Sequence, residues 1–513
     1  MTNFSNTTTL IDLLENGDPN HPAIVVPDGP IITYGSLRDQ VRAMVSKLKH
    51  IGINPSDRVA IVLSNAPETI ISFLAAASAA TAAPLNPAYK KEEFQFYLND
   101  TGAKAIITNE QIGEAAVAAA TDTTITINIQ LDPDGIAKLD PTSSEVPPNT
   151  TESTPRNTDD VALILHTSGT TSRPKRVPLT HEKLVASVEH IVDTYKLSKD
   201  DVSLCVMPLF HVHGLVASTL STLASGGTII VPPRFNALNF WRLIREHGVT
   251  WFTAVPTMHQ ALLARARASQ ANTSETEGHS TLRFIRSCSA PLAATTMLEM
   301  EDKFGVPVLE AYGMTEASHQ MSSNPLPPDR RIPGSVGRGT GVSISIMNDA
   351  GVIQPADTRG EVVIKGPNVI TAYEDNPEAN VASFTNGWFR TGDEGSIDND
   401  GYLTLLGRLK EIINRSGEKI SPQEIDEVLL AHPAVSEAVA FAAPHSTHGE
   451  EPTAAVVLNT EVSESELVKH CREHLADFKC PRTIHIVDQI PRTATGKVQR
   501  RMVAAVIIGS ESQ

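Results

Sequence analysis

The chain has 513 residues and a formal net charge of −17, and its apolar and charged fractions are those of a soluble globular protein. Its length exceeds one ordinary core and predicts two to four subdomains. The negative charge argues against bulk binding to nucleic acid or to an anionic membrane, so an anionic substrate would need locally concentrated Lys and Arg.

The N-terminal third predicts an α/β layered domain. Residues 1–20 are acidic and lack a basic segment, so no signal peptide is expected. Helix-spaced apolar residues at 41–48 precede strand-like runs at 59–63 and 104–108. The longest apolar stretch, Ile70–Ala83, is shorter than the roughly 20 residues of a membrane span and predicts a buried helix.

Residues 161–192 predict a strand, a loop and a helix. The apolar run Val161–Leu165 leads into His-Thr-Ser-Gly-Thr-Thr-Ser-Arg-Pro-Lys at 166–175, and helix-spaced apolar residues follow Thr180, a candidate N-cap. Amides and hydroxyls at such a turn bind phosphate oxygens, and cations neutralise them. Because the Walker A pattern is absent, the segment indicates another type of phosphate loop, with an ordinary surface loop as the alternative.

Two histidines, His211 and His213, follow in Met207–Leu215. They could bind a metal, but no third ligand has a suitable spacing, so a pocket wall with imidazole edges is favoured over zinc. Strand-like segments at 227–232 and 249–254 predict a second α/β layer resembling the first.

Two further predicted strands end in polar turns, one at Ser289 and one at Thr315 and Glu316. Ligands of parallel sheets bind at the carboxyl ends of strands, so these turns and the phosphate loop could converge on one crevice. Short Gly-punctuated strands between 343 and 406 suggest a small β-barrel. Three glycines at 337, 339 and 341 precede a strand rather than a helix and therefore form no dinucleotide fingerprint.

A domain boundary is predicted at Gly407–Lys410. It separates an N-terminal domain, 1–409, from a compact α+β domain, 410–513, in which the turn-rich loop 490–497 carries Lys497. The cysteines lack CxxC spacing and indicate reduced core thiols in a cytoplasmic protein. They are Cys205, Cys288, Cys471 and Cys480.

Five ordered motifs resemble those of the adenylate-forming superfamily, which contains acyl-CoA synthetases, luciferases and the adenylation domains of peptide synthetases. They are Thr167–Lys175, Tyr312–Glu316, Thr391–Asp393, Gly407–Lys410 and Pro491–Lys497. The resemblance covers nearly the whole chain. It implies an α/β fold with two stacked layers and a β-barrel in the large domain, and a small mobile C-terminal domain. It also implies an enzyme that converts a carboxylic acid and ATP to acyl-AMP and pyrophosphate, then transfers the acyl group to coenzyme A.

The resemblance implies a nucleotide-binding role for most matched residues. The β- and γ-phosphates of ATP would contact Thr167, Ser168, Gly169, Thr170, Thr171, Ser172 and Lys175. The adenine would lie against Ser289, Ala290, Pro291, Glu310, Ala311, Tyr312 and Gly313. Asp393 would accept hydrogen bonds from the ribose hydroxyls, supported by Arg408.

Other matches imply roles in catalysis and domain movement. Thr315 would hold the α-phosphate, and Glu316 would bind Mg²⁺, a hard cation that prefers oxygen ligands. Lys497 and Mg²⁺ would offset charge that develops on the phosphate. Because Lys497 cannot serve both half-reactions in one geometry, the small domain would rotate about Lys410. After rotation Gly417 would line the pantetheine tunnel, and His211 resembles the superfamily's aromatic-gate histidine.

Two positions depart from the common pattern. Ser172 and Arg176 both stand where glycine is usual. Ser172 implies a less open loop backbone or an added hydroxyl donor. Arg176 either adds charge beside the triphosphate or points to solvent.

Longer stretches resemble the plant and fungal branch related to oxalate–CoA ligases, which implies oxalate as the acid. They are His166–Lys175, Pro208–Gly214, Phe284–Ser289 and Glu316–Pro325. A small dianion needs hydrogen-bond donors and positive charge, which His319, Ser289 and His213 could supply. His319 could instead be a structural histidine, and Arg286 is interpreted as a structural ion-pair partner.

Other functions remain open. The acid could be acetate, malonate, or a medium-chain or aromatic acid, and a non-catalytic nucleotide-binding protein could share the fold. No carrier domain follows Gln513, so coenzyme A is preferred over a carrier protein as acceptor. We expect a monomer or homodimer without a membrane span or a nucleic-acid partner.

Overall fold

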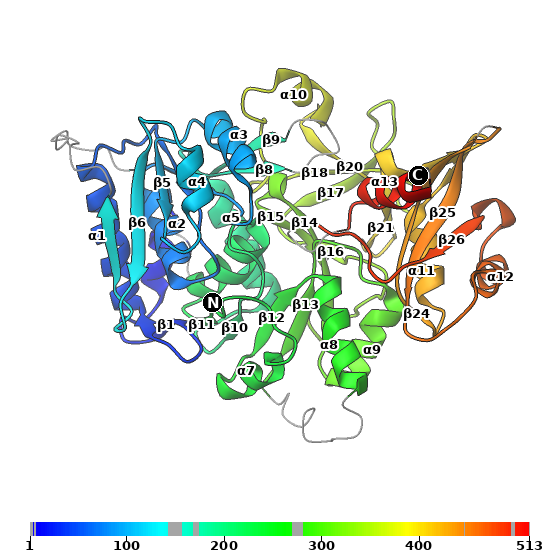
Figure 1. Ribbon diagram of the computed structural model, residues 1–513, viewed down its shortest axis with the longest axis horizontal. Helices are drawn as coiled ribbons and strands as arrows, with labels where there is room; N and C mark the ends of the chain where they lie inside the picture. The colour runs from blue at the N-terminus through cyan, green and yellow to red at the C-terminus, as the bar shows by residue number, and fades with distance from the viewer. Residues whose placement is uncertain are drawn as a thin grey trace.

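The computed structural model describes residue 4 and residues 7–141, 156–167, 174–268, 281–445, 447–493 and 498–511 (Figure 1). Two large sheets stack face to face, with helices between them and on both outer faces. The alternation of side chains along the strands produces this layering, because neighbouring residues face opposite sides of a sheet. Trp251 packs into the core between the sheets, whereas the next residue, Phe252, packs into a separate outer core.

The first large sheet has seven strands in the order β7-β6-β5-β3-β4-β8-β9. The inner strands are parallel, and the edge strands β7 and β9 are antiparallel to their neighbours. The strands are β3 (Arg58–Ile61), β4 (Thr81–Pro84), β5 (Ala105–Thr108), β6 (Ile125–Leu131), β7 (Ala137–Pro141), β8 (Val161–Thr167) and β9 (Lys175–Thr180).

The second large sheet has nine strands in the order β16-β15-β14-β13-β12-β10-β11-β1-β2. Its strands are β1 (Pro22–Val25), β2 (Ile31–Thr33), β10 (Val202–Leu204), β11 (Thr228–Ile230), β12 (Trp251–Ala254), β13 (Phe284–Ser287), β14 (Val308–Met314), β15 (His319–Ser323) and β16 (Arg338–Gly339). The first two strands of the chain therefore belong to the second layer, where β1 pairs with β11.

Helices form three layers around these sheets. These layers include short 3-10 turns and one π-helix. Between the sheets and at their ends lie α1 (Tyr34–His50), α2 (Pro67–Ala79), α5 (His181–Tyr195), the π-helix η2 (His213–Leu220), α6 (Ser221–Ala224) and η1 (Asp12–Asn16). The outer faces carry α3 (Lys91–Thr101), α4 (Glu114–Ala119), α7 (Phe240–Glu246), α8 (Pro256–Ala268) and α9 (Ala294–Phe304). None of the helices in the described ranges is both long and apolar enough to cross a membrane.

Two local predictions were wrong in their boundaries. The helix predicted over Ile70–Ala83 ends at Ala79, and residues 81–84 form β4, because an unbroken apolar run does not distinguish a buried helix from a buried strand. Likewise Lys175–Thr180 is a strand rather than part of the loop. Thr180 is confirmed as the N-cap of α5, since its hydroxyl accepts from the Lys183 amide at 3.3 Å.

A third, antiparallel sheet occupies the region where we predicted a β-barrel. It pairs in the order β17-β18-β20-β19, with β21 on β20. Its strands are β17 (Ser343–Met347), β18 (Gly360–Lys365), β19 (Phe384–Thr385), β20 (Trp388–Ile397) and β21 (Leu403–Arg408), with α10 (Pro377–Ser383) beside them.

The last hundred residues build a fourth sheet with its own core, drawn orange to red in Figure 1. It comprises β22 (Ile413–Arg415), β23 (Glu418–Ile420), β24 (Val435–His445), β25 (Gly449–Leu458) and β26 (Thr483–Ile486), with helices α11 (Pro422–Leu430), α12 (Glu464–His474) and α13 (Arg500–Glu511) and the turn η6 (Asp477–Lys479). The turn η5 (Leu409–Glu411) connects it to β21. The division at 409/410 stays a prediction.

Candidate active site

The ends of β13 and β14, which carry the residues expected to bound the adenine, lie side by side. Ser287 pairs with Glu310 in parallel register, so Ser289–Pro291 follow β13 next to the end of β14. The Leu292 amide donates to Glu310 Oε1 at 2.9 Å and fastens the turn to the strand. Burial raises the pKa of Glu310 to about 8, so this carboxyl is neutral near pH 7.

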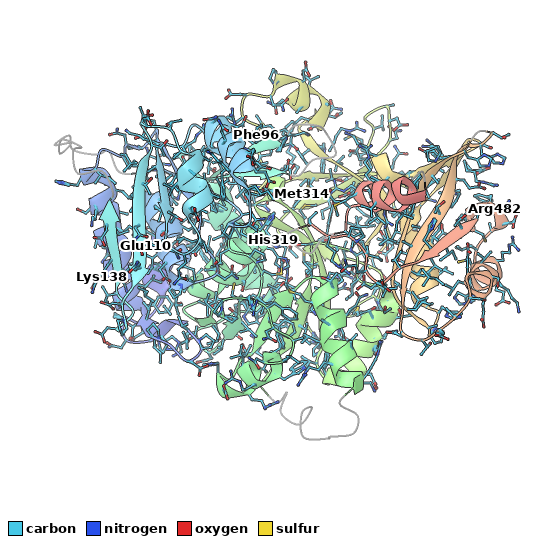
Figure 2. The ribbon with its side chains drawn as sticks, viewed as in Figure 1. Phe96, Glu110, Lys138, Met314, His319 and Arg482 are labelled. Atoms are coloured by element: carbon cyan, nitrogen blue, oxygen red, sulfur yellow. The ribbon has the colours of Figure 1, made fainter. Side chains whose placement is uncertain are left out.

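Figure 2 labels Met314 and His319, which lie near the middle of the molecule where β14 turns back into β15. This hairpin is very tight at Gly313, where a Cβ atom would lie 2.1 Å from the His319 carbonyl oxygen. The turn η4 (Thr315–Ala317) leads to Ser318 and His319, which have φ values of 52° and 119°. Such strained backbone in non-glycine residues is typical of functional sites.

Asp393 forms a complete ion pair at the predicted ribose position. Its Oδ1 accepts from Arg408 Nε at 2.8 Å, and its Oδ2 accepts from the Tyr312 hydroxyl. Burial raises the pKa of Asp393, and the charge of Arg408 opposes that rise. Each carboxylate oxygen keeps a further lone pair, so Asp393 can still accept hydrogen bonds from a ligand.

Glu316 lies near the cationic side chain of Lys175, which in turn lies near Lys410. Its Oε1 accepts from the Tyr373 hydroxyl at 2.8 Å, and the Lys175 ammonium lies 4.3 Å from the centre of the Tyr373 ring. Burial lowers the pKa of Lys175, while the Glu316 charge raises it and the Lys410 charge lowers it. Lys175 and Lys410 therefore add positive charge near a buried carboxylate, as a triphosphate site requires.

The three residues predicted to bind the acid lie together. His213, at the start of η2, contacts Ser289 Oγ through Nδ1 at 2.9 Å and Thr253 Oγ1 through Nε2 at 2.6 Å. Its ring centre lies 5.0 Å from that of His319, edge to face. His213 and His319 are buried, whereas Ser289, with φ at 74°, is partly exposed.

Several other predicted residues are placed without a test of their role. His211 is half-buried beside Phe210, and Thr315 is half-buried in η4. Lys410 is exposed in η5, and Gly417, with φ at 94°, lies in the exposed turn between β22 and β23. Thr167 and Lys175 pair across the ends of β8 and β9. Ser168–Ser172 and Lys497 lie outside the described residues.

Arg176 is paired with carboxylates, an arrangement that neither of the two alternatives from the sequence anticipated. Its guanidinium contacts Asp100, Glu374 and Asp375, with Nε 2.8 Å from Glu374 Oε2, and the side chain is 14% exposed. It therefore joins β9 to neighbouring segments. Within the described chain, the one group of His, Cys, Asp or Glu side chains spaced for a metal ion is His470, Glu473 and His474 on α12.

The sequence did not identify the residues that hydrogen-bond to the proposed site residues from neighbouring segments. Tyr373 and Thr253 have no motif of their own, and Arg286 was misread as an ion-pair partner. It donates instead to three neutral groups, Tyr195 Oη, Thr253 Oγ1 and Gln320 Oε1. The only signal was the polar stretch after Glu316, which contains Gln320.

Comparison with known proteins gives matches along almost the whole chain. Residues 15–374 match the AMP-binding enzyme family, and residues 424–497 match the AMP-binding enzyme C-terminal domain. The chain is 47% identical to an oxalate–CoA ligase of Arabidopsis thaliana, covering 97% of this chain and 98% of that protein. It is 42% identical to an oxalate–CoA ligase of Saccharomyces cerevisiae, with 94% of each covered. The solved structure of o-succinylbenzoate coenzyme A synthetase from Bacillus subtilis with ATP and a magnesium ion matches with a TM-score of 0.83 at 29% identity, covering 97% of this chain and 99% of that one.

Proposed function

Because the chain belongs to the AMP-binding enzyme family, we propose that it is an AMP-forming oxalate–CoA ligase. The observation that carries the proposal is the agreement over nearly the full length with oxalate–CoA ligases from a plant and a fungus. The cluster of His213, Ser289 and His319 supports it, because a small dianion needs several donors in one place.

In the first half-reaction an oxalate oxygen attacks the α-phosphorus of ATP, and pyrophosphate leaves. Thr167, Lys175 and the loop Ser168–Ser172 would bind the β- and γ-phosphates, and Thr315 the α-phosphate. The adenine would lie between Ser289–Pro291 and Glu310–Gly313, with the ribose on Asp393. Lys497 would offset charge that develops on the phosphate oxygens.

Glu316 fits the role of a Mg²⁺ ligand. Its carboxylate offers hard oxygen donors, is 6% exposed and lies beside the positive charge of Lys175, where phosphate oxygens would also lie. A bound Mg²⁺ would neutralise part of the phosphate charge. Tyr373 holds one oxygen of Glu316 and thereby orients the other.

In the second half-reaction the thiol of coenzyme A attacks the acyl carbon of oxalyl-AMP and AMP leaves. Adenylation makes AMP the leaving group, whereas a free carboxylate has no good leaving group. The C-terminal domain, 410–513, would rotate about Lys410 and bring Gly417 to the pantetheine tunnel, while His211 gates the acid site. The separate sheet and core of this domain support such a rotation.

An AMP-release assay with coenzyme A and five acids tests the substrate. Oxalate should have a higher kcat/KM than malonate, acetate, octanoate and coumarate. A higher value for any of the other four would refute the assignment of oxalate and leave the family intact. The same assay without Mg²⁺ tests the proposed metal.

Two finer proposals concern the setting of the enzyme. All four cysteines are buried free thiols, as expected for a protein of the reducing cytoplasm. A monomer or homodimer is expected, and sedimentation of the purified protein distinguishes the two.

A further inference from the structure

Arg286 is a buried cation without a carboxylate partner in the described part of the chain. It lies in the middle of β13, and its side chain is 0% exposed. Nε donates to the Tyr195 hydroxyl at 2.8 Å, and Nη2 donates to Gln320 Oε1 at 3.0 Å. These partners are a hydroxyl and an amide oxygen rather than carboxylates, and the thiol of Cys288 also lies close to the guanidinium. Burying an unpaired charge is costly, so such a cation indicates an anion that the protein itself does not supply.

The third donor group of Arg286 leads toward the acid site. Parallel register places Thr253 of β12 beside Arg286, and Nη1 donates to Thr253 Oγ1 at 3.0 Å. The same oxygen lies 2.6 Å from Nε2 of His213, while Nη1 lies 3.5 Å from that nitrogen. A proton on Nε2 would point at a guanidinium N–H, so Nε2 is the acceptor and the Thr253 hydroxyl is the donor.

This direction fixes the rest of the chain of hydrogen bonds. With Nε2 accepting, the ring proton of His213 lies on Nδ1, which donates to Ser289 Oγ at 2.9 Å. Ser289 accepts that bond and therefore keeps its own hydrogen for another partner. Since Ser289 is partly exposed and the other members are buried, the free hydroxyl hydrogen lies at the outer end of the chain.

We infer that Arg286, acting through Thr253 and His213, makes Ser289 a fixed donor and selects acids that carry a second anionic group beside the reacting carboxylate. This inference rests on the proposed acid site at Ser289, His213 and His319. Arg286 is a positioning residue, because His213 and Thr253 lie between it and Ser289. Its buried charge acts across the ring of His213 because screening is weak in the interior. The added negative charge of a dicarboxylate is thereby favoured over an uncharged group of the same size.

Thr253→Val tests the relay, defined as Arg286, Thr253, His213 and Ser289. Valine keeps the shape of threonine, removes the hydroxyl and leaves the bonds of Arg286 to Tyr195 and Gln320 in place. The measurement is kcat/KM for oxalate divided by kcat/KM for glycolate, which has one carboxylate and nearly the same size. We expect this ratio to fall 10- to 100-fold in Thr253→Val, with KM for ATP within about twofold of the wild type. Thr253→Ser, which restores the hydroxyl, should restore most of the ratio.

Arg286→Gln and Arg286→Lys distinguish the effect of the Arg286 charge from the effect of a general loss of stability. Glutamine removes the charge and should lower the ratio. Lysine keeps the charge and should give a ratio between those of Arg286→Gln and the wild type, even if both variants have the same decrease in Tm. An unchanged ratio in Thr253→Val, or an equal loss for both acids, would overturn the inference and leave Arg286 a structural residue. If Arg286→Gln fails to fold, Thr253→Val decides alone.

The wild-type panel separates this inference from the proposed function. If another dicarboxylate is preferred to oxalate, the proposed function fails, and the ratio is measured with that acid and its one-carboxylate analogue. If the wild type prefers a monocarboxylate, both proposals fail.

Discussion

The two ends of the candidate site hold buried charge in opposite ways. At the proposed ribose end Asp393 is paired with Arg408 and hydrogen-bonded by Tyr312, so the protein supplies both charges itself. At the proposed acid end Arg286 is fully buried and donates to a hydroxyl and an amide oxygen. The difference teaches that one end has both charges of its ion pair within the protein, whereas the other holds a buried cation whose counter-charge, in our proposal, comes from the acid.

The largest effect is expected where the complete pair is broken. Asp393→Ala removes the proposed ribose acceptor and leaves Arg408 and the Tyr312 hydroxyl without their shared partner. We expect kcat/KM for ATP to fall about 100-fold, or about 2.7 kcal/mol, while KM for oxalate changes little. Steady-state kinetics with ATP and oxalate varied in turn provide the measurement, with exposed Asp400→Ala as control. An equal rise in both KM values would show that the two ends are not independent.

The neutral carboxyl of Glu310 gives a pH-dependent effect of intermediate size. Its pKa is raised by burial to about 8 in the folded protein, from 4.5. The unfolded chain therefore ionises at lower pH than the folded one, and this residue costs stability progressively from about pH 5 to pH 8. Glu310→Gln keeps the acceptor for the Leu292 amide and removes that cost.

We therefore expect the stability of Glu310→Gln relative to wild type to rise from pH 5 to pH 8 by on the order of 2 kcal/mol. Urea unfolding at several pH values measures it. A difference that is independent of pH would mean that Glu310 ionises normally in the folded protein.

Arg176 is a mostly buried arginine whose guanidinium, unlike that of Arg286, is paired with carboxylates. Arg176→Met should reduce the free energy of unfolding by about 2 kcal/mol, because Asp100 and Glu374 each lose one partner and keep His166 and Arg58, respectively. KM for ATP should stay within about twofold, since the guanidinium faces these carboxylates. Arg359→Met, which removes an exposed guanidinium 3.5 Å from Glu394, should leave stability nearly unchanged. A large rise in KM for ATP would place Arg176 at the triphosphate after all.

The smallest effect concerns the hydroxyl that holds Glu316. Tyr373→Phe removes the 2.8 Å hydrogen bond to Glu316 and keeps the ring beside Lys175. The Mg²⁺ concentration for half-maximal activity should rise about two- to fivefold, or about 1 kcal/mol or less. Magnesium titrations of the AMP-release rate measure it. Tyr402→Phe, whose hydroxyl donates to the Arg330 carbonyl, should show no shift.

Much of the fold could be predicted from periodicity, and the failures have physical causes. The strands at β3, β5 and β8 were predicted because short apolar runs between turns are typical of buried parallel strands. The placement of β1 and β2 could not be predicted, because pairing partners far apart in sequence leave no local pattern. The strand β9 was missed because Pro178 interrupts the alternation of Val177 and Leu179.

The candidate site shows the same limit. The motifs identified residues that we propose contact the ligands, and the structure brings Ser289, His213 and His319 together. They could not identify Thr253 or assign Arg286, because the role of each depends on the residue beside it in the neighbouring strand. An arginine in a strand is more often paired, and only the three-dimensional neighbours show that this one is not paired with a carboxylate in the described chain.

The pairing of β1 with β11 also has a consequence for how the protein is made. Ile24 pairs with Ile229, so the first strand emerges from the ribosome long before its partner exists. At 5–20 residues per second, the interval is about 10 to 40 s. During that time β1 and β2 present unpaired backbone groups that other chains could join. Once β11 is synthesised, β1 can pair with it. We expect chaperones to bind the nascent chain most strongly before that point.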